Sequence, residues 1–116
     1  DTITTLMKER LGDVVEDVRA TKSLVDSPVR LTASEGGFDF NLERILKAQN
    51  PDFKVSKKIL EINPNHELIK KIPNLSSDLQ ISVCRLLVEQ ARILDGEIPS
   101  DPRQFSQDLI LISQSL

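Results

Sequence analysis

The sequence has no tryptophan and no tyrosine, and only four phenylalanines. Base-stacking platforms and aromatic binding hot spots are therefore scarce. One cysteine and one histidine exclude an internal disulfide, fit a reducing compartment and leave almost no ligands for a zinc site. No uncharged apolar run approaches the ~18 residues of a membrane span. A net charge of −3 argues against a general nucleic-acid binder.

What remains is typical of one small globule. The chain has 116 residues, of which 39% are hydrophobic and 28% charged, and these values favour a single packed core over a disordered tail. The sequence opens with Asp1 instead of methionine, in a segment of helical character. We therefore expect it to be part of a longer polypeptide.

The predicted elements are a helix, then strands, then mostly helices. We expect a helix over 4–11 that ends at Gly12, and strands over 14–21 and 29–32. Both strands are rich in β-branched residues and a turn cluster separates them, so we expect an antiparallel pair. A third strand is expected over 59–62. The predicted fold class is α+β, with a small three-stranded sheet and packed helices, followed by two C-terminal helices.

Three helix-start signals mark the second half of the chain. Asparagine, serine and aspartate are good N-caps, proline suits the first helical position, and glycine ends a helix. The signals are Asn63-Pro64, Ser77 with Gln80 as a capping box for a helix that ends at Gly96, and Asp101-Pro102.

The helix expected over 78–95 is apolar around too much of its circumference for one packed face. At ~100° per residue its apolar side chains cover about 240°, whereas one packed face needs about 100° or somewhat more. Arg85, Glu89 and Arg92 share the remaining sector, where Arg85 and Glu89 are spaced to pair. The apolar side chains are Leu79, Ile81, Val83, Cys84, Leu86, Leu87, Val88, Ala91, Ile93 and Leu94.

The last helix has the same excess of apolar surface. A pair of antiparallel helices cannot bury two faces each, but two copies of the pair can, as an intermolecular four-helix bundle around a two-fold axis. The alternative is that the preceding α/β part covers the second faces. The stripe of the last helix consists of Phe105, Leu109, Ile112 and Leu116, with Ile110 and Leu111 on other sides.

A short amphipathic helix is expected over about 39–49, between Gly36-Gly37 and Asn50-Pro51. Its charged residues lie opposite its apolar stripe. Either the stripe packs onto the sheet, or part of it stays exposed as an adaptable contact for a partner. The stripe consists of Phe38, Leu42, Ile45 and Leu46.

Residues that resemble catalytic groups have structural explanations. His66 lies near a helix N-terminus, which disfavours a protonated imidazole, and Cys84 lies in an apolar arc that raises a thiol pKa. Glu16 and Asp17 point to opposite faces of a strand. We predict no catalytic, cofactor-binding or metal-binding residue, and no enzyme activity in this chain. A mild basic cluster is expected on a solvated face and consists of Lys54, Lys57, Lys58, Lys70 and Lys71.

Three stretches resemble the C-terminal domain of the ninety-kilodalton heat-shock chaperones. They are LERILKAQ at 42–49, KKILEINPNH at 57–66, and VRAT followed by LVDSP within 18–28. The third is similar to that family's opening hairpin. The resemblance extends from about residue 6 to the chain end, and LEINPxH is its most specific part.

The resemblance implies a constitutive dimerisation module, closed by the last two helices of each protomer. It implies that the short amphipathic helix contacts unfolded or partly folded client proteins, through Phe38, Leu42, Ile45 and Leu46. We expect the homodimer interface to contain Leu79, Val83, Leu86, Leu87, Ile93, Leu94, Phe105, Leu109 and Ile112.

The resemblance also implies a single domain over 1–116, with an α/β part over 1–74 and a two-helix dimerisation element over 75–116. It places the ATPase site in an N-terminal domain outside this sequence. Cytosolic eukaryotic members end in an acidic tail closing with Met-Glu-Glu-Val-Asp, whereas this sequence stops at Gln114-Ser115-Leu116. The expected type is therefore bacterial and cytoplasmic (HtpG type), or organellar. The alternative function is a monomeric adaptor that binds one defined partner through an exposed apolar helix.

Overall fold

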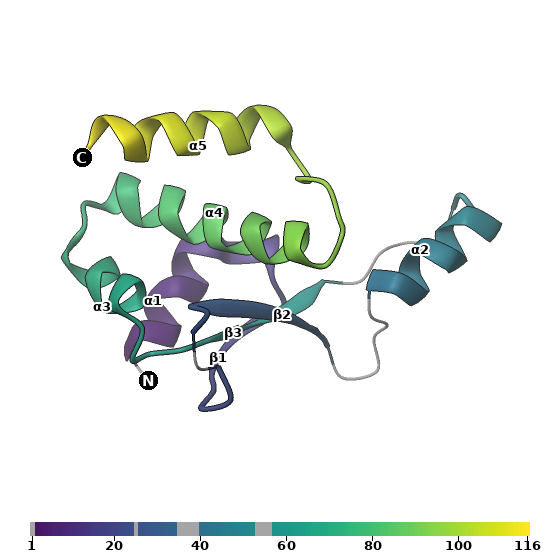
Figure 1. The fold of residues 1–116 in the computed structure, drawn as a ribbon, viewed down its shortest axis with the longest axis horizontal. Coiled ribbons are helices and arrows are strands. Elements are labelled where there is room, and N and C mark those ends of the chain that lie inside the picture. The colour runs from purple at the N-terminus through teal and green to yellow at the C-terminus, as the bar shows by residue number, and fades with distance from the viewer. Residues whose placement is uncertain (1, 25, 35–39, 53–56) are drawn as a thin grey trace.

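The computed structural model describes residues 2–24, 26–34, 40–52 and 57–116, with only the backbone of Phe40. Within these ranges it has a mixed three-stranded sheet and five α-helices (Figure 1). This confirms the α+β class. The elements are α1 (Thr2–Leu11), η1 (Gly12–Val14), β1 (Asp17–Ala20), β2 (Val29–Ala33), α2 (Phe40–Gln49), β3 (Lys58–Ile62), α3 (Glu67–Lys71), η2 (Ile72–Asn74), α4 (Ser77–Leu94) and α5 (Pro102–Gln114).

The strand order is β1-β3-β2, so the predicted pairing of the first two strands is wrong. They run in opposite directions, but β3 lies between them, parallel to β1 and antiparallel to β2. The physical reason is burial. Ile59 and Leu60 are both buried although they point to opposite faces of the sheet, and a strand buried on both faces belongs at the centre. Arg19 and Arg30, by contrast, are exposed on the outer strands.

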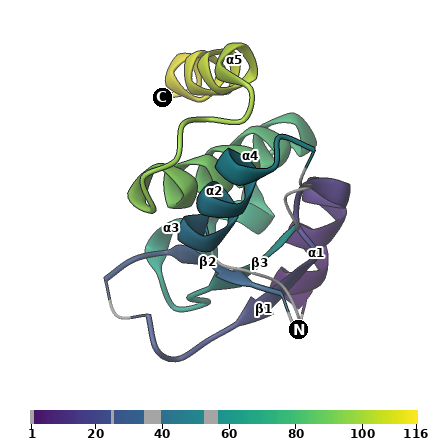
Figure 2. The same ribbon diagram turned by 90° about the vertical axis from the view of Figure 1, so that its right-hand side faces the viewer.

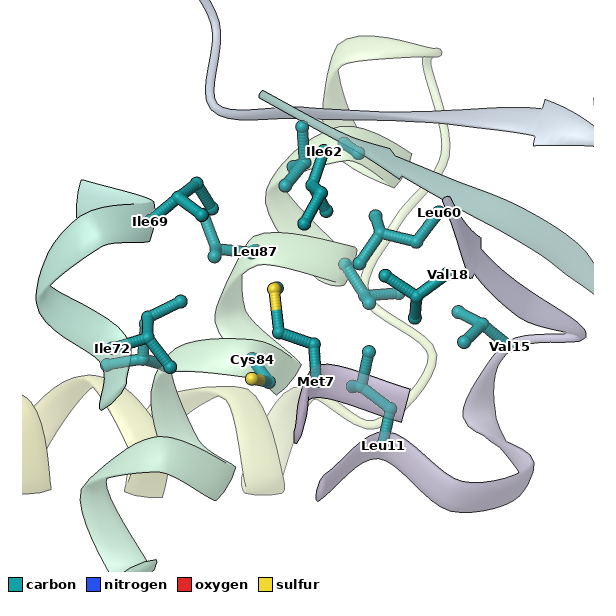
Figure 3. Close-up of a cluster of buried hydrophobic side chains, with 14 residues drawn as sticks. Met7, Leu11, Val15, Val18, Leu60, Ile62, Ile69, Ile72, Cys84 and Leu87 are labelled. Atoms are coloured by element: carbon teal, nitrogen blue, oxygen red, sulfur yellow. The ribbon is translucent and has the colours of Figure 1, made fainter. Parts of the chain in front are cut away.

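The core lies on one face of this sheet. Val18, Leu60 and Leu31 are aligned across the three strands, and α1 and α4 pack over that face. Figure 3 shows Met7 and Leu11 of α1 and Cys84 and Leu87 of α4 pointing into the same cluster. The α/β part and α4 therefore share one core.

The helix ends follow the predicted signals, with two corrections. Asp101 caps α5, and Gly12 and Gly96 adopt positive φ angles of 56° and 86° where helices end. The cap of α4 is Ser76, one residue before the predicted Ser77. The cap of α3 is His66 instead of Asn63, because the Asn63 side chain accepts a hydrogen bond from the Asn65 amide within a preceding turn.

The α5 helix packs against α4 on the side away from the sheet (Figures 1 and 2). One side of α4 therefore faces the core and another faces α5. This layering decides which surfaces of the two C-terminal helices stay uncovered.

Candidate interaction surfaces on α2, α4 and α5

A buried polar cluster joins α5 to α4. Asp108 of α5 is 3% exposed and is the buried residue of that helix. Its carboxylate accepts hydrogen bonds from Arg85 Nε at 2.9 Å and Nη2 at 2.8 Å, from Ser82 Oγ at 3.0 Å and from Gln104 Nε2 at 3.0 Å. A buried carboxylate needs such partners, because an unpaired charge away from water is costly.

This cluster replaces the predicted pairing of Arg85 with Glu89. Glu89 accepts hydrogen bonds from the Ser100 amide at 2.8 Å and the Ser100 hydroxyl at 2.9 Å, and Arg92 Nε lies 3.8 Å from its carboxylate. The charged sector of α4 thus faces α5 and the connection before it. Sequence reasoning missed Asp108, whose signal is a lone acid beside the apolar run Leu109–Ile112.

The side of α5 that faces α4 includes the buried Asp108, while three apolar side chains of the helix are exposed. Leu109 and Ile110 are 49% and 54% exposed, and Leu111 is also exposed. Phe105 and Ile112 are half-buried. Residues 109–111 are therefore left uncovered, whereas Ile112 packs against the core.

The predicted interface residues of α4 fall into two groups. Ile93 and Leu94 are exposed, Leu94 at 69%, while Leu79 and Leu86 are half-buried. Val83 and Leu87 belong to the core of the chain itself, because they lie on the side of α4 that packs over the sheet. Val83 and Leu87 therefore expose little surface that a second copy could contact.

Exposed and half-buried side chains of α4 and α5 surround a hollow of about 270 Å³. Leu86, Gln90, Ile93 and Leu94 of α4 line it together with Phe105 of α5. Gln90 Oε1 is buried there and accepts no hydrogen bond from the described residues. We call this surface, with Leu109 and Ile112, the α4–α5 face.

The α2 helix also attaches through charged residues. Glu43 is the buried residue among side chains 41–49, and it forms a buried ion pair with Lys58 of β3. Arg44 Nε lies 3.1 Å from Glu97 Oε2, and Arg44 Nη2 donates to the Asp95 carbonyl at 3.3 Å. Lys58 therefore does not lie on a solvated face as predicted.

The apolar stripe of α2 is turned away from these anchors. Leu42 is 40% and Ile45 is 55% exposed, and Leu46 is half-buried. The predicted contact residue Phe38 lies outside the described residues. Figure 1 shows α2 standing apart from the sheet, beyond the C-terminal end of α4. The interpretation in which the whole stripe packs onto the sheet is wrong for Leu42 and Ile45.

His66 and Cys84 have structural roles. His66 Nδ1 accepts a hydrogen bond from the Leu68 amide at 3.1 Å and so caps α3. Cys84 is fully buried, and burial raises the pKa of its thiol to about 11. Such a thiol is almost entirely protonated near neutral pH and is a poor nucleophile.

No group of three or more His, Cys, Asp or Glu side chains in the described part is placed to hold a metal ion. None of the helices in those ranges is long and apolar enough to cross a bilayer.

Comparison with known proteins shows the family. The model of the Hsp90 protein family matches residues 1–115. The chain is similar to the chaperone protein HtpG of Nitrobacter winogradskyi, with 43% identity over 107 residues, which is 90% of this chain and 17% of that protein. For HtpG of Rhizobium etli the identity is 45% over 104 residues, 88% of this chain and 16% of that protein. The chain spans about a sixth of the length of these curated relatives. It belongs to the Hsp90 protein family.

Proposed function

We propose that this chain is the homodimerisation and client-contact module of an HtpG-type chaperone, located toward the C-terminal end of its parent. The α4 and α5 helices of two copies form a four-helix bundle, and α2 presents its apolar stripe to unfolded proteins. The module itself has no catalytic role. Any ATPase activity belongs to another part of the parent.

The observation that carries the dimer proposal is the buried Asp108 between α4 and α5. An amphipathic helix in a monomer normally buries its apolar side. Here α5 buries an aspartate and exposes Leu109, and on the same face α4 exposes Ile93 and Leu94. A two-fold axis beside the α4–α5 face would cover both copies of this surface at once.

Dimerisation through this module would tether two copies of the parent chain to each other. When two parent chains are joined at one end, their other domains are held near each other at an effective concentration of roughly millimolar. Association of other parts of the parent then becomes intramolecular. This explains why a domain without catalytic residues would matter to a chaperone.

The proposal is tested by the solution mass of the chain. Light scattering across a dilution series should give twice 13.0 kDa, and the mass should persist well below micromolar concentration because the exposed surface is apolar. A monomer at every concentration would refute the bundle. The chain would then be better explained as a monomeric adaptor.

Client contact is tested separately with variants of the exposed α2 stripe. We expect Leu42→Ser with Ile45→Ser to reduce binding of unfolded polypeptides severalfold, because it removes two exposed apolar contacts while Glu43 and Arg44 keep α2 in place. The probes are two unrelated proteins, reduced and alkylated so that they stay unfolded, and binding is followed by fluorescence anisotropy.

The matched control for this test is Lys47→Gln, an exposed change on the same helix. It should leave binding unchanged. Equal binding by the double variant and the unaltered chain would exclude α2 as the contact. Loss of binding to one probe alone would favour the adaptor function over the chaperone function.

A further inference from the structure

Charged contacts attach α2 to two separate parts of the molecule. The Glu43–Lys58 pair joins it to β3, and both side chains are at most 5% exposed. Arg44 joins it to the segment that follows α4, through Glu97 and the Asp95 carbonyl. No described side chain over 41–49 contributes a fully buried apolar group to this attachment.

The position of Arg44 at the end of α4 is favourable in itself. The carbonyl groups at a helix C-terminus carry partial negative charge and attract a cation. The guanidinium group lies directly beside Gly96, since a Cβ atom built there would be 3.5 Å from Arg44 Nη1. Asp95 and Glu97 flank that glycine, so Arg44 contacts the residues on both sides of it.

The turn at Gly96 begins the connection between α4 and α5. The amides of Gly96 and Glu97 bond back to the Ile93 and Arg92 carbonyls of α4, each at 3.0 Å. The other end of the connection is fixed where Ser100 bonds to Glu89. Arg44 of α2 thus holds one end of the segment that positions α5, and Glu89 of α4 holds the other.

We propose that Arg44 couples α2 to the α4–α5 connection, so that α2 docks and undocks through ion pairs and its undocking loosens residues 95–100. The coupling rests on the proposed function, because it links the client-contact helix to the dimerisation helices. Coupling between two sites is reciprocal: ordering of the connection in the dimer favours docked α2, and displacement of α2 weakens the dimer.

The test is amide hydrogen exchange on the full chain, with Arg44→Gln as the variant. We expect exchange to rise about two- to fivefold within α2, the range for a partly exposed ion pair. It should rise together at the Asp95, Gly96, Glu97 and Ser100 amides, which are hydrogen-bonded in the structure. Lys47→Gln on the same helix is the control and should change neither segment.

Salt provides a second measurement without mutation. Raising NaCl from about 0.05 M to about 0.5 M screens partly exposed charges. It should therefore reproduce the effect of Arg44→Gln in the unaltered chain and add little in the variant. Glu43→Gln removes the buried carboxylate that pairs with Lys58 and should raise exchange in α2 more than Arg44→Gln does, because breaking a buried ion pair costs more than breaking an exposed one.

Two outcomes would overturn the proposal. Faster exchange in α2 alone, with residues 95–100 unchanged, would show that the helix is not coupled to the connection. No change in either segment with Arg44→Gln would show that Arg44 does not hold α2. Mass measured on the same samples keeps the proposals separate, since a monomer refutes the dimer while exchange still tests the coupling.

Discussion

Replacing Asp108 with alanine should lower the free energy of unfolding by about 3 kcal/mol, the lower end of the range for breaking a buried ion pair. The change leaves the Arg85 guanidinium and the Ser82 hydroxyl without the carboxylate that they contact. The lower end applies because the Arg85 side chain is 35% exposed, so water compensates part of its loss. Urea unfolding followed by circular dichroism, at one fixed protein concentration, measures the difference.

Two further variants show whether the carboxylate is responsible. Asp108→Asn keeps the volume and one acceptor, and should lose less than Asp108→Ala. Replacing both partners, Arg85→Met with Asp108→Leu, should recover most of the stability, since paired apolar substitutions of a buried ion pair are often neutral. A change below about 0.5 kcal/mol for Asp108→Ala, the size of an ordinary surface substitution, would mean that the cluster does not hold α5.

Replacing Phe105 with alanine should raise the dissociation constant of the dimer at least about a thousandfold. Truncating a fully buried phenylalanine costs about 3–5 kcal/mol, and a two-fold interface loses two such side chains at once. Phe105 is already half-buried in the single chain, which reduces the expected loss. Even so, about 4 kcal/mol over both copies corresponds to a thousandfold change in affinity. Sedimentation or light scattering on a dilution series measures it.

The matched control is Ile45→Ala, an exposed aliphatic residue on α2, outside the α4–α5 face. It should leave the dissociation constant unchanged. An unchanged constant with Phe105→Ala would exclude Phe105 from the interface. Equal weakening by both variants would point to a general loss of structure in place of a specific contact.

The order of the strands in the sheet could not be predicted from local sequence signals. The strands expected over 14–21 and 29–32 were recognisable from their β-branched residues and flanking turn signals. The structure forms them over Asp17–Ala20 and Val29–Ala33, and Val14 belongs to η1 instead. Which strand each of them pairs with was not recognisable, because the pairing depends on which strand can be buried on both faces. Lys58–Ile62, with Ile59 and Leu60 both buried, takes the centre of the sheet although it comes last along the chain.

Helix boundaries were predictable because their signals are local. Asp101-Pro102 and the two glycines with positive φ act within a few residues of where they stand. The cap of α3 was assigned wrongly for the same local reason. The Asn63 side chain could accept a hydrogen bond either as a helix cap or within a turn. In the structure it accepts one from the Asn65 amide, in the turn that precedes α3.

The sequence by itself determined that α4 and α5 carry more apolar surface than one face can bury, and that α2 is amphipathic. Only the tertiary structure decided which side of each helix faces inward. That choice depends on pairs far apart along the chain, Asp108 with Arg85 across 23 residues and Glu43 with Lys58 across 15. A buried charge must meet its partner, so these pairs fix which sides of α2 and α5 face inward and leave Leu42, Ile45, Leu109 and Ile110 exposed.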